Sequence, residues 1–166
     1  FFFRFRKQFK FQADYVSGNS KVSLENLLRL GDFYPALNRI INKIRKADII
    51  ILNAEGDYIF TTPSRRNMSF FNMIIEFAHQ SKIPIFWTNG MFSADPNGNW
   101  NIIDKQNSLV QLRKCQGVLC RDSQSEKFLK DHLNCSFVAD AAFIWPASTN
   151  KSPSFLAPRE RFFSQE

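Results

Sequence analysis

The sequence has few of the residues on which several common classes of protein depend. Glycine occurs only 6 times in 166 residues. Neither a P-loop nor a G-x-G-x-x-G fingerprint is present, which excludes the usual glycine-rich cradle for a pyrophosphate. No apolar run approaches the roughly 18 residues of a membrane-spanning helix, so we expect no membrane span. A Ser-His-Asp type of nucleophile triad is also not recognisable.

Cysteine and histidine are equally scarce. The three cysteines, Cys115, Cys120 and Cys135, are spaced by 5 and 15 residues, and neither spacing is that of a zinc site or a redox pair. We therefore expect three reduced, half-buried thiols in a reducing compartment, and hence a cytoplasmic location. His79 and His132 each lie inside a helical pattern. These observations predict neither a metal site nor a bound cofactor.

The net charge of +7 is concentrated at the start of the sequence. Four basic residues and no acidic residue occur among the first ten, where phenylalanine alternates with arginine and lysine. Such a segment is compatible with an edge strand, a membrane-surface contact or a nucleic-acid contact. We favour a fourth interpretation, that residues 1–11 are the leading segment of a truncated protein, and expect no nucleic-acid partner.

From residue 35 onward, helical and strand-like segments alternate. Apolar residues at helical spacing predict helices near 35–46, 70–78 and 104–114, and a fourth helix begins at Ser123. Continuous apolar runs predict strands at 49–52, 83–88, 117–120 and 135–139. The first run, Ile49 to Leu52, does not alternate with polar residues, which is typical of a strand covered on both faces.

This alternation with short connections predicts an α/β, Rossmann-like three-layer domain with a mainly parallel sheet. Residues 12–146 would form the domain, and residues 147–166 a tail or linker. Apolar spacing predicts a short helix that ends before Gly31, and residues 90–101 have the composition of a loop. Residues 123–126, Ser-Gln-Ser-Glu, match a capping box at the start of the last helix.

Polar residues follow each predicted strand, at the edge where parallel sheets bind ligands. They are Asn53, Glu55, Gly56 and Asp57 after the first strand, Asn89 after the second, Arg121 with Ser125 after the third, and Asp140 after the fourth. The two carboxylates beside Gly56 are suited to orient a sugar hydroxyl or to act as a base. The arginine is suited to clamp a phosphate or carboxylate.

Structural alternatives exist for each of these groups. Residues 53–57 also fit a simple turn, and Asn89 followed by glycine is a common turn dipeptide. Arg121 also fits an ion pair with Asp122 or Asp140. Asp122, Ser123 and Ser125 also fit helix-capping roles.

Four segments, in order, resemble motifs of the polysaccharide pyruvyl transferase family. Residues 47–57 form an Asp-led apolar run into Asn-Ala-Glu-Gly-Asp, and residues 83–89 are similar to the family's next strand. Residues 118–125 and 135–143 are similar to its Val-x-x-Arg-Asp/Glu-x-x-Ser motif and to its strand that ends in Asp-x-x-Phe. The matching motif positions are Arg121, Ser125, Asp140 and Phe143. The resemblance covers about residues 35–145.

The resemblance implies one lobe of a two-lobed, B-type glycosyltransferase fold. It further implies transfer of pyruvate from phosphoenolpyruvate to a sugar of a polysaccharide, without another cofactor. Glu55, Asp57 and Arg121 would be catalytic, the first two facing the acceptor and the arginine holding an anion. The remaining ligand contacts would be Asn53, Gly56, Asn89, Ser125 and Asp140.

The family's second lobe, with its Arg-x-His motif, has no counterpart in these 166 residues. We therefore expect the chain to be one incomplete lobe with little activity alone, unless a second polypeptide or a homodimer completes the cleft. The alternatives are a non-catalytic Rossmann-like binding module, a lobe of a sugar-nucleotide glycosyltransferase, and a membrane- or nucleic-acid-associated protein led by its basic terminus.

Overall fold

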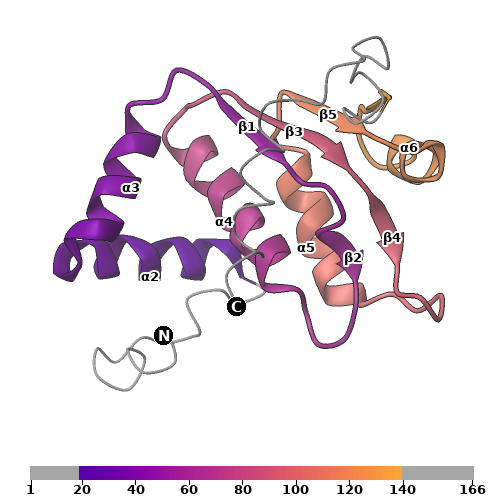
Figure 1. The fold of residues 1–166 in the computed structure, drawn as a ribbon, viewed down its shortest axis with the longest axis horizontal. Helices are drawn as coiled ribbons and strands as arrows, with labels where there is room; N and C mark the ends of the chain where they lie inside the picture. Colours follow the sequence, from indigo (N-terminus) through magenta and orange to yellow (C-terminus); the bar gives the residue numbers. More distant parts are fainter. Residues whose placement is uncertain (1–18, 140–166) are drawn as a thin grey trace, which may run out of the picture.

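The computed structural model describes residues 19–139, in which helices and strands alternate along the chain (Figure 1). The helices are α2 (Ser20–Phe33), α3 (Pro35–Arg45), α4 (Arg66–Gln80), α5 (Ile102–Leu112) and α6 (Ser123–Lys130). The strands are β1 (Ile50–Asn53), β2 (Tyr58–Phe60), β3 (Ile85–Gly90), β4 (Phe92–Ala94), β5 (Gly117–Cys120) and β6 (Ser136–Phe137).

Four strands form a parallel sheet in the order β1-β3-β5-β6. The helices α4, α5 and α6 connect successive strands, so the sheet grows in one direction along the chain. Beyond it, β2 and β4 pair as a second, two-stranded parallel sheet. The predicted class is confirmed: the protein is α/β, with a mainly parallel sheet flanked by helices, consistent with a Rossmann-like fold.

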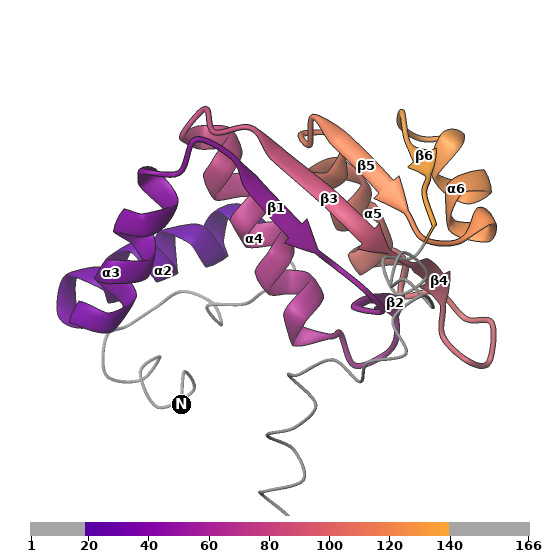
Figure 2. The ribbon, with the colours of Figure 1, turned by 45° about the horizontal axis from the view of Figure 1, so that its top comes forward.

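The core lies between one face of the sheet and the helices α4 and α5 (Figure 2). Alternate residues of each strand point into it, since successive side chains of a strand point to opposite faces. Leu52, Ile85, Trp87 and Val118 are all buried there. Helix α6 lies on the same side, because its buried Leu129 joins the same cluster.

The opposite face of the sheet is open in the region that the structure describes. The side chain of Ile51 is 64% exposed and that of Ile49 is 50% exposed. Each of α4, α5 and α6 connects one strand to the next strand of the sheet. Because such connections all have the same hand, the three helices lie on the same face of the sheet. The prediction that Ile49 to Leu52 is covered on both faces is therefore wrong for residues 19–139.

Three local predictions are also corrected. The first helix does not end before Gly31 but continues to Phe33, with Gly31 buried against Ile41 of α3. Residues 90–101 are not simply a loop, because β4 lies within them and pairs with β2. Such three-residue strands are too short to show a period in the sequence, and their pairing depends on how the larger sheet places them.

The predicted capping box is wrong because the residue before it caps the helix. The carboxylate of Asp122 accepts a hydrogen bond from the backbone N–H of Ser125 at 2.7 Å. Glu126 instead accepts from the backbone N–H of Phe137 at 2.9 Å and pairs with Lys130. A charged acceptor at the N-cap also interacts favourably with the positive end of the helix.

Buried polar side chains connect α4 with α5 and with β2. The hydroxyl of Tyr58 donates to the side-chain oxygen of Asn72 at 3.1 Å, and the amide of Asn72 donates to Ser108 at 2.9 Å. One turn further along α4, the carboxylate of Glu76 accepts bonds from Gln80, Gln111 and Lys114. These contacts hold the body of α4 against β2 and α5.

Candidate functional site

The carboxyl ends of β1, β3 and β5 lie next to one another and carry most of the predicted site residues. The backbone N–H of Met91 donates to the carbonyl of Glu55 at 2.8 Å, and that of Arg121 donates to the carbonyl of Gly90 at 3.1 Å. We call this border the carboxyl rim. It consists of Asn53, Glu55, Gly56, Asp57, Asn89 and Arg121. The predicted Asp140 and Phe143 lie outside the described residues.

A chain of side-chain hydrogen bonds crosses the rim from β3 to the residues after β1. The amide of Asn89 donates to the side-chain oxygen of Asn53 at 3.0 Å. The amide of Asn53 in turn donates to the carboxylate of Glu55 at 3.2 Å. These bonds orient an exposed carboxylate, which is an acceptor for the hydroxyl groups of a ligand.

Two rim residues have left-handed backbone conformations. Glu55 has φ +41° and Asn89 has φ +53°. Residues other than glycine rarely adopt this region, and such residues cluster at binding and catalytic sites. The pairing of β3 with β5 also shifts register between Trp87 and Gly90. The rim side chains therefore lie where the backbone after β1 and at the end of β3 departs from regular extended geometry.

Two arginines from different elements approach Gly56. The guanidinium of Arg65 donates to the carbonyl oxygen of Gly56 at 3.0 Å. A Cβ placed on Gly56 would lie 3.9 Å from Nη2 of Arg121. The same turn is joined to α4 a second time, because the amide of Asn67 donates to the carboxylate of Asp57 at 3.1 Å. Cationic groups thus lie directly beside the acidic part of the rim.

Arg65 and Asn67 are rim neighbours that the sequence reasoning missed. A usable signal was present in the Arg65-Arg66 pair at the start of α4, since helices favour acidic residues in the first turn. That turn contains no acidic residue, and the N-cap, Arg65, makes no side-chain cap. A helix N-terminus of this kind favours an anion nearby.

Ser125 lies apart from the rim surface. It is 1% exposed, its hydroxyl donates to Asp122 at 2.6 Å, and it accepts from the backbone N–H of Phe92 at 2.7 Å. These bonds join β4 to the start of α6. Its contacts are therefore those of a structural residue below the rim.

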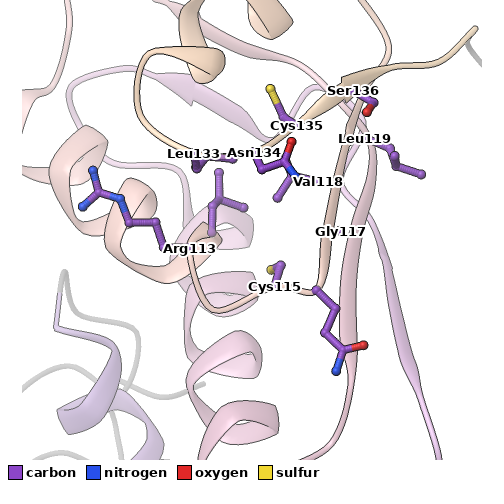
Figure 3. Close-up of a pocket in the computed structure, with 11 residues that line it drawn as sticks. Arg113, Cys115, Gly117, Val118, Leu119, Leu133, Asn134, Cys135 and Ser136 are labelled. Carbon is purple, nitrogen blue, oxygen red and sulfur yellow. The ribbon is translucent and has the colours of Figure 1, made fainter.

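Two cavities of the described region lie away from the rim. One of about 390 Å³ opens between β5 and the residues before β6, with Cys115 and Cys135 among its lining residues (Figure 3). Another of about 600 Å³ lies where the start of α2 meets α4 and α5. Neither is lined by a predicted site residue.

The three cysteines are free in the structure, where Cys115 is half-buried, as expected, and Cys120 and Cys135 are buried. Burial raises the pKa of Cys115 and of Cys120 to about 12 and also raises the pKa of Cys135. Thiols with such raised pKa values stay protonated at neutral pH and are poor nucleophiles. The cavity in Figure 3 is therefore not equipped for thiolate chemistry.

Residues 19–139 contain neither a metal-binding cluster nor a membrane-spanning helix. Within residues 19–139, no group of three or more histidine, cysteine, aspartate or glutamate side chains is arranged to hold a metal ion. No helix in the same range is both long and apolar enough to cross a membrane.

Comparisons of the chain with protein-family models, with curated proteins and with solved structures find no match. The geometry of the carboxyl rim is therefore the basis on which a function is inferred.

Proposed function

We propose that this chain is one lobe of a transferase that modifies a sugar of a polysaccharide, and that its carboxyl rim binds the reacting groups. The observation that carries the proposal is the juxtaposition around Gly56. The hydrogen-bonded carboxylate of Glu55 precedes Gly56 in the chain. The guanidinium groups of Arg65 and Arg121 both approach Gly56. A carboxylate can take the proton of an acceptor hydroxyl, and guanidinium groups can hold an anionic donor.

The resemblance of residues 35–145 to polysaccharide pyruvyl transferases favours phosphoenolpyruvate as the donor. In that reaction two sugar hydroxyls form bonds to C2 of the donor, and the bond from C2 to the phosphate oxygen breaks. One hydroxyl proton goes to the methylene carbon, which becomes a methyl group, and the other leaves with inorganic phosphate. The product is a ketal, so atoms and electrons balance without a redox partner.

Each rim residue has a role in this proposal that follows from its contacts. Glu55, held by Asn53, which Asn89 holds in turn, accepts a proton from an acceptor hydroxyl. Arg121 and Arg65 hold the phosphate or carboxylate of the donor, for which a planar guanidinium is well suited. Asp57 is joined to α4 through Asn67 and faces the acceptor.

A complete transferase requires groups beyond this rim. The acid that protonates the methylene carbon and the opposite wall of the cleft would come from a second lobe, supplied by another polypeptide or a second copy. Without it, we expect ligand binding but little turnover. Three free thiols agree with a reducing location such as the cytoplasm.

Thermal-shift titration of residues 1–166 with phosphoenolpyruvate tests the proposal. A ligand at 100 times its dissociation constant stabilises the folded state by about 2.7 kcal/mol. We expect R121A to remove the stabilisation by phosphoenolpyruvate and E55Q to leave it largely intact. The matched control is R113A, since Arg113 bonds the carbonyl of His132 instead.

The same titration distinguishes the outcomes. Stabilisation lost in R121A and kept in R113A supports an anion site at the rim. No stabilisation by phosphoenolpyruvate, or equal stabilisation of both variants, overturns it. A separate activity assay adds a lobe that bears the Arg-x-His motif. Binding of phosphoenolpyruvate without turnover in that assay favours a non-catalytic binding module.

A further inference from the structure

The outer edge of β1 has no strand partner within residues 19–139. Among the described residues β1 pairs only with β3. The backbone N–H of Ile50 donates to Pro84 at 2.8 Å, and that of Ala54 donates to Thr88 at 3.0 Å. Consecutive residues of a strand point their N–H and C=O groups to opposite sides. The backbone groups of Ile49, Ile51 and Asn53 therefore point away from β3, to the outer edge.

The side chains of these three residues lie on the open face of the sheet. Ile51 pairs in register with Phe86, so both side chains point to this face, where Ile51 is 64% exposed. Figure 2 shows β1 as the outermost strand. Proteins protect such edges with lysine, proline or inward-pointing charge. None of these occurs between Ile49 and Asn53.

This edge is complementary to itself. If two copies of β1 meet antiparallel about a two-fold axis at Ile51, that residue faces its own copy and Ile49 faces Asn53. All three have outward backbone groups, so each facing pair exchanges both of its hydrogen bonds. The two exposed Ile51 side chains then pack against each other at the centre, as directly opposed cross-strand residues do.

The charges at the two ends of β1 favour the same orientation. The exposed Lys43, Arg45 and Lys46 precede the strand, where only Asp48 opposes them, and Glu55 and Asp57 follow it. An antiparallel arrangement keeps the two basic ends apart, because it brings the basic end of one copy to the end of the other copy where Glu55 and Asp57 lie beside Arg65 and Arg121. A parallel arrangement would place like charges together, which disfavours that alternative.

We propose that a second copy of this chain binds the free edge of β1, so that the two four-stranded sheets join into one continuous sheet. The interface is isologous, because the same residues act on both sides of the axis. The dimer requires no ligand at the carboxyl rim. It therefore stands or falls separately from the proposed transferase function.

Sedimentation velocity of residues 1–166 over a range of concentrations tests this inference. We expect a species of twice the 19.4 kDa chain mass. In I51K, the concentration at which half the chains are dimeric should rise at least about tenfold, which corresponds to 1.4 kcal/mol. The matched control is I103K on α5, where Ile103 is 70% exposed, far from β1 in the fold. That variant should remain dimeric.

Cross-linking provides a second readout that does not depend on a charged substitution. Directly opposed residues of a hydrogen-bonded antiparallel pair have Cα atoms about 5.5 Å apart, within the range of a disulfide. Mild oxidation should therefore convert I51C, but not I103C, into a covalent dimer. Cys120 and Cys135 are buried, and I103C shares the half-buried Cys115 with I51C, so any background from the native thiols is the same in both variants.

Three results would overturn the inference. The first is a monomeric chain at all concentrations. The second is I51K dimerising as tightly as I103K. The third is a dimer that disappears when residues 1–11 are deleted, which would assign the association to the leading segment instead of β1.

Discussion

Removing the lysine that neutralises the buried Glu76 should destabilise the protein strongly. Glu76 is 2% exposed, and its partner Lys114 is 18% exposed. Removing one partner of a buried pair typically costs about 3–5 kcal/mol. In K114M the amides of Gln80 and Gln111 still donate to the carboxylate. We therefore expect a loss of about 2–3 kcal/mol in the free energy of unfolding at pH 7.

The destabilisation should depend on pH in a defined direction. Burial alone would raise the pKa of Glu76, but hydrogen bonds from Lys114, Gln80 and Gln111 lower it below its ordinary value of 4.5. The stability that this ionised group contributes is present above the unfolded pKa and is lost as pH falls through the folded pKa. Without Lys114, burial favours the protonated form. The deficit of K114M should therefore shrink between pH 7 and pH 4.

Urea unfolding at both pH values measures this difference. The matched control is K130M, because Lys130 forms an exposed pair with Glu126 at 2.9 Å, and such pairs contribute little. If K114M loses no more stability than K130M at pH 7, or if its deficit is the same at pH 4, Glu76 does not depend on Lys114 as described.

Two further predictions concern close packing and buried thiols. A Cβ on Gly90 would overlap the buried indole of Trp87, so G90A should lower the free energy of unfolding by about 1–3 kcal/mol. At Gly56 the nearest atoms lie 3.9 Å from such a Cβ, so the melting temperature of G56A should stay near that of the wild type. Burial raises the pKa of Cys115 and Cys120 to about 12. Both should therefore react slowly with a disulfide reagent at pH 8 in the native protein and promptly in urea; rapid native reaction would contradict their raised pKa values.

The larger elements could be predicted because their signals are local. The spacing of apolar residues in α3 and α5, and the apolar runs of β1, β3 and β5, show their structure within a few residues. Their order then required parallel strands, which brought Glu55, Asn89 and Arg121 to one border. The general place of the candidate site thus followed from connectivity alone.

The missed features depend on contacts between distant segments. Arg65 reaches Gly56 only because α4 returns its first turn to the end of β1. The exposure of Ile51 depends on what covers the sheet, and a run of isoleucines is the same whether one face or both are covered. The capping box failed for a local reason instead, because Asp122, already a candidate helix cap in the sequence, accepts from the backbone N–H of Ser125 three residues on.

The most direct test of the carboxyl rim as a ligand site is a ¹H–¹⁵N spectrum of residues 1–166 during titration with phosphoenolpyruvate. We expect the backbone amides of Glu55, Gly56, Asn89 and Arg121 to shift together, with a common dissociation constant, while those lining the cavity of Figure 3 do not move. Shifts confined to that cavity, or an unchanged rim at saturating ligand, would contradict the account.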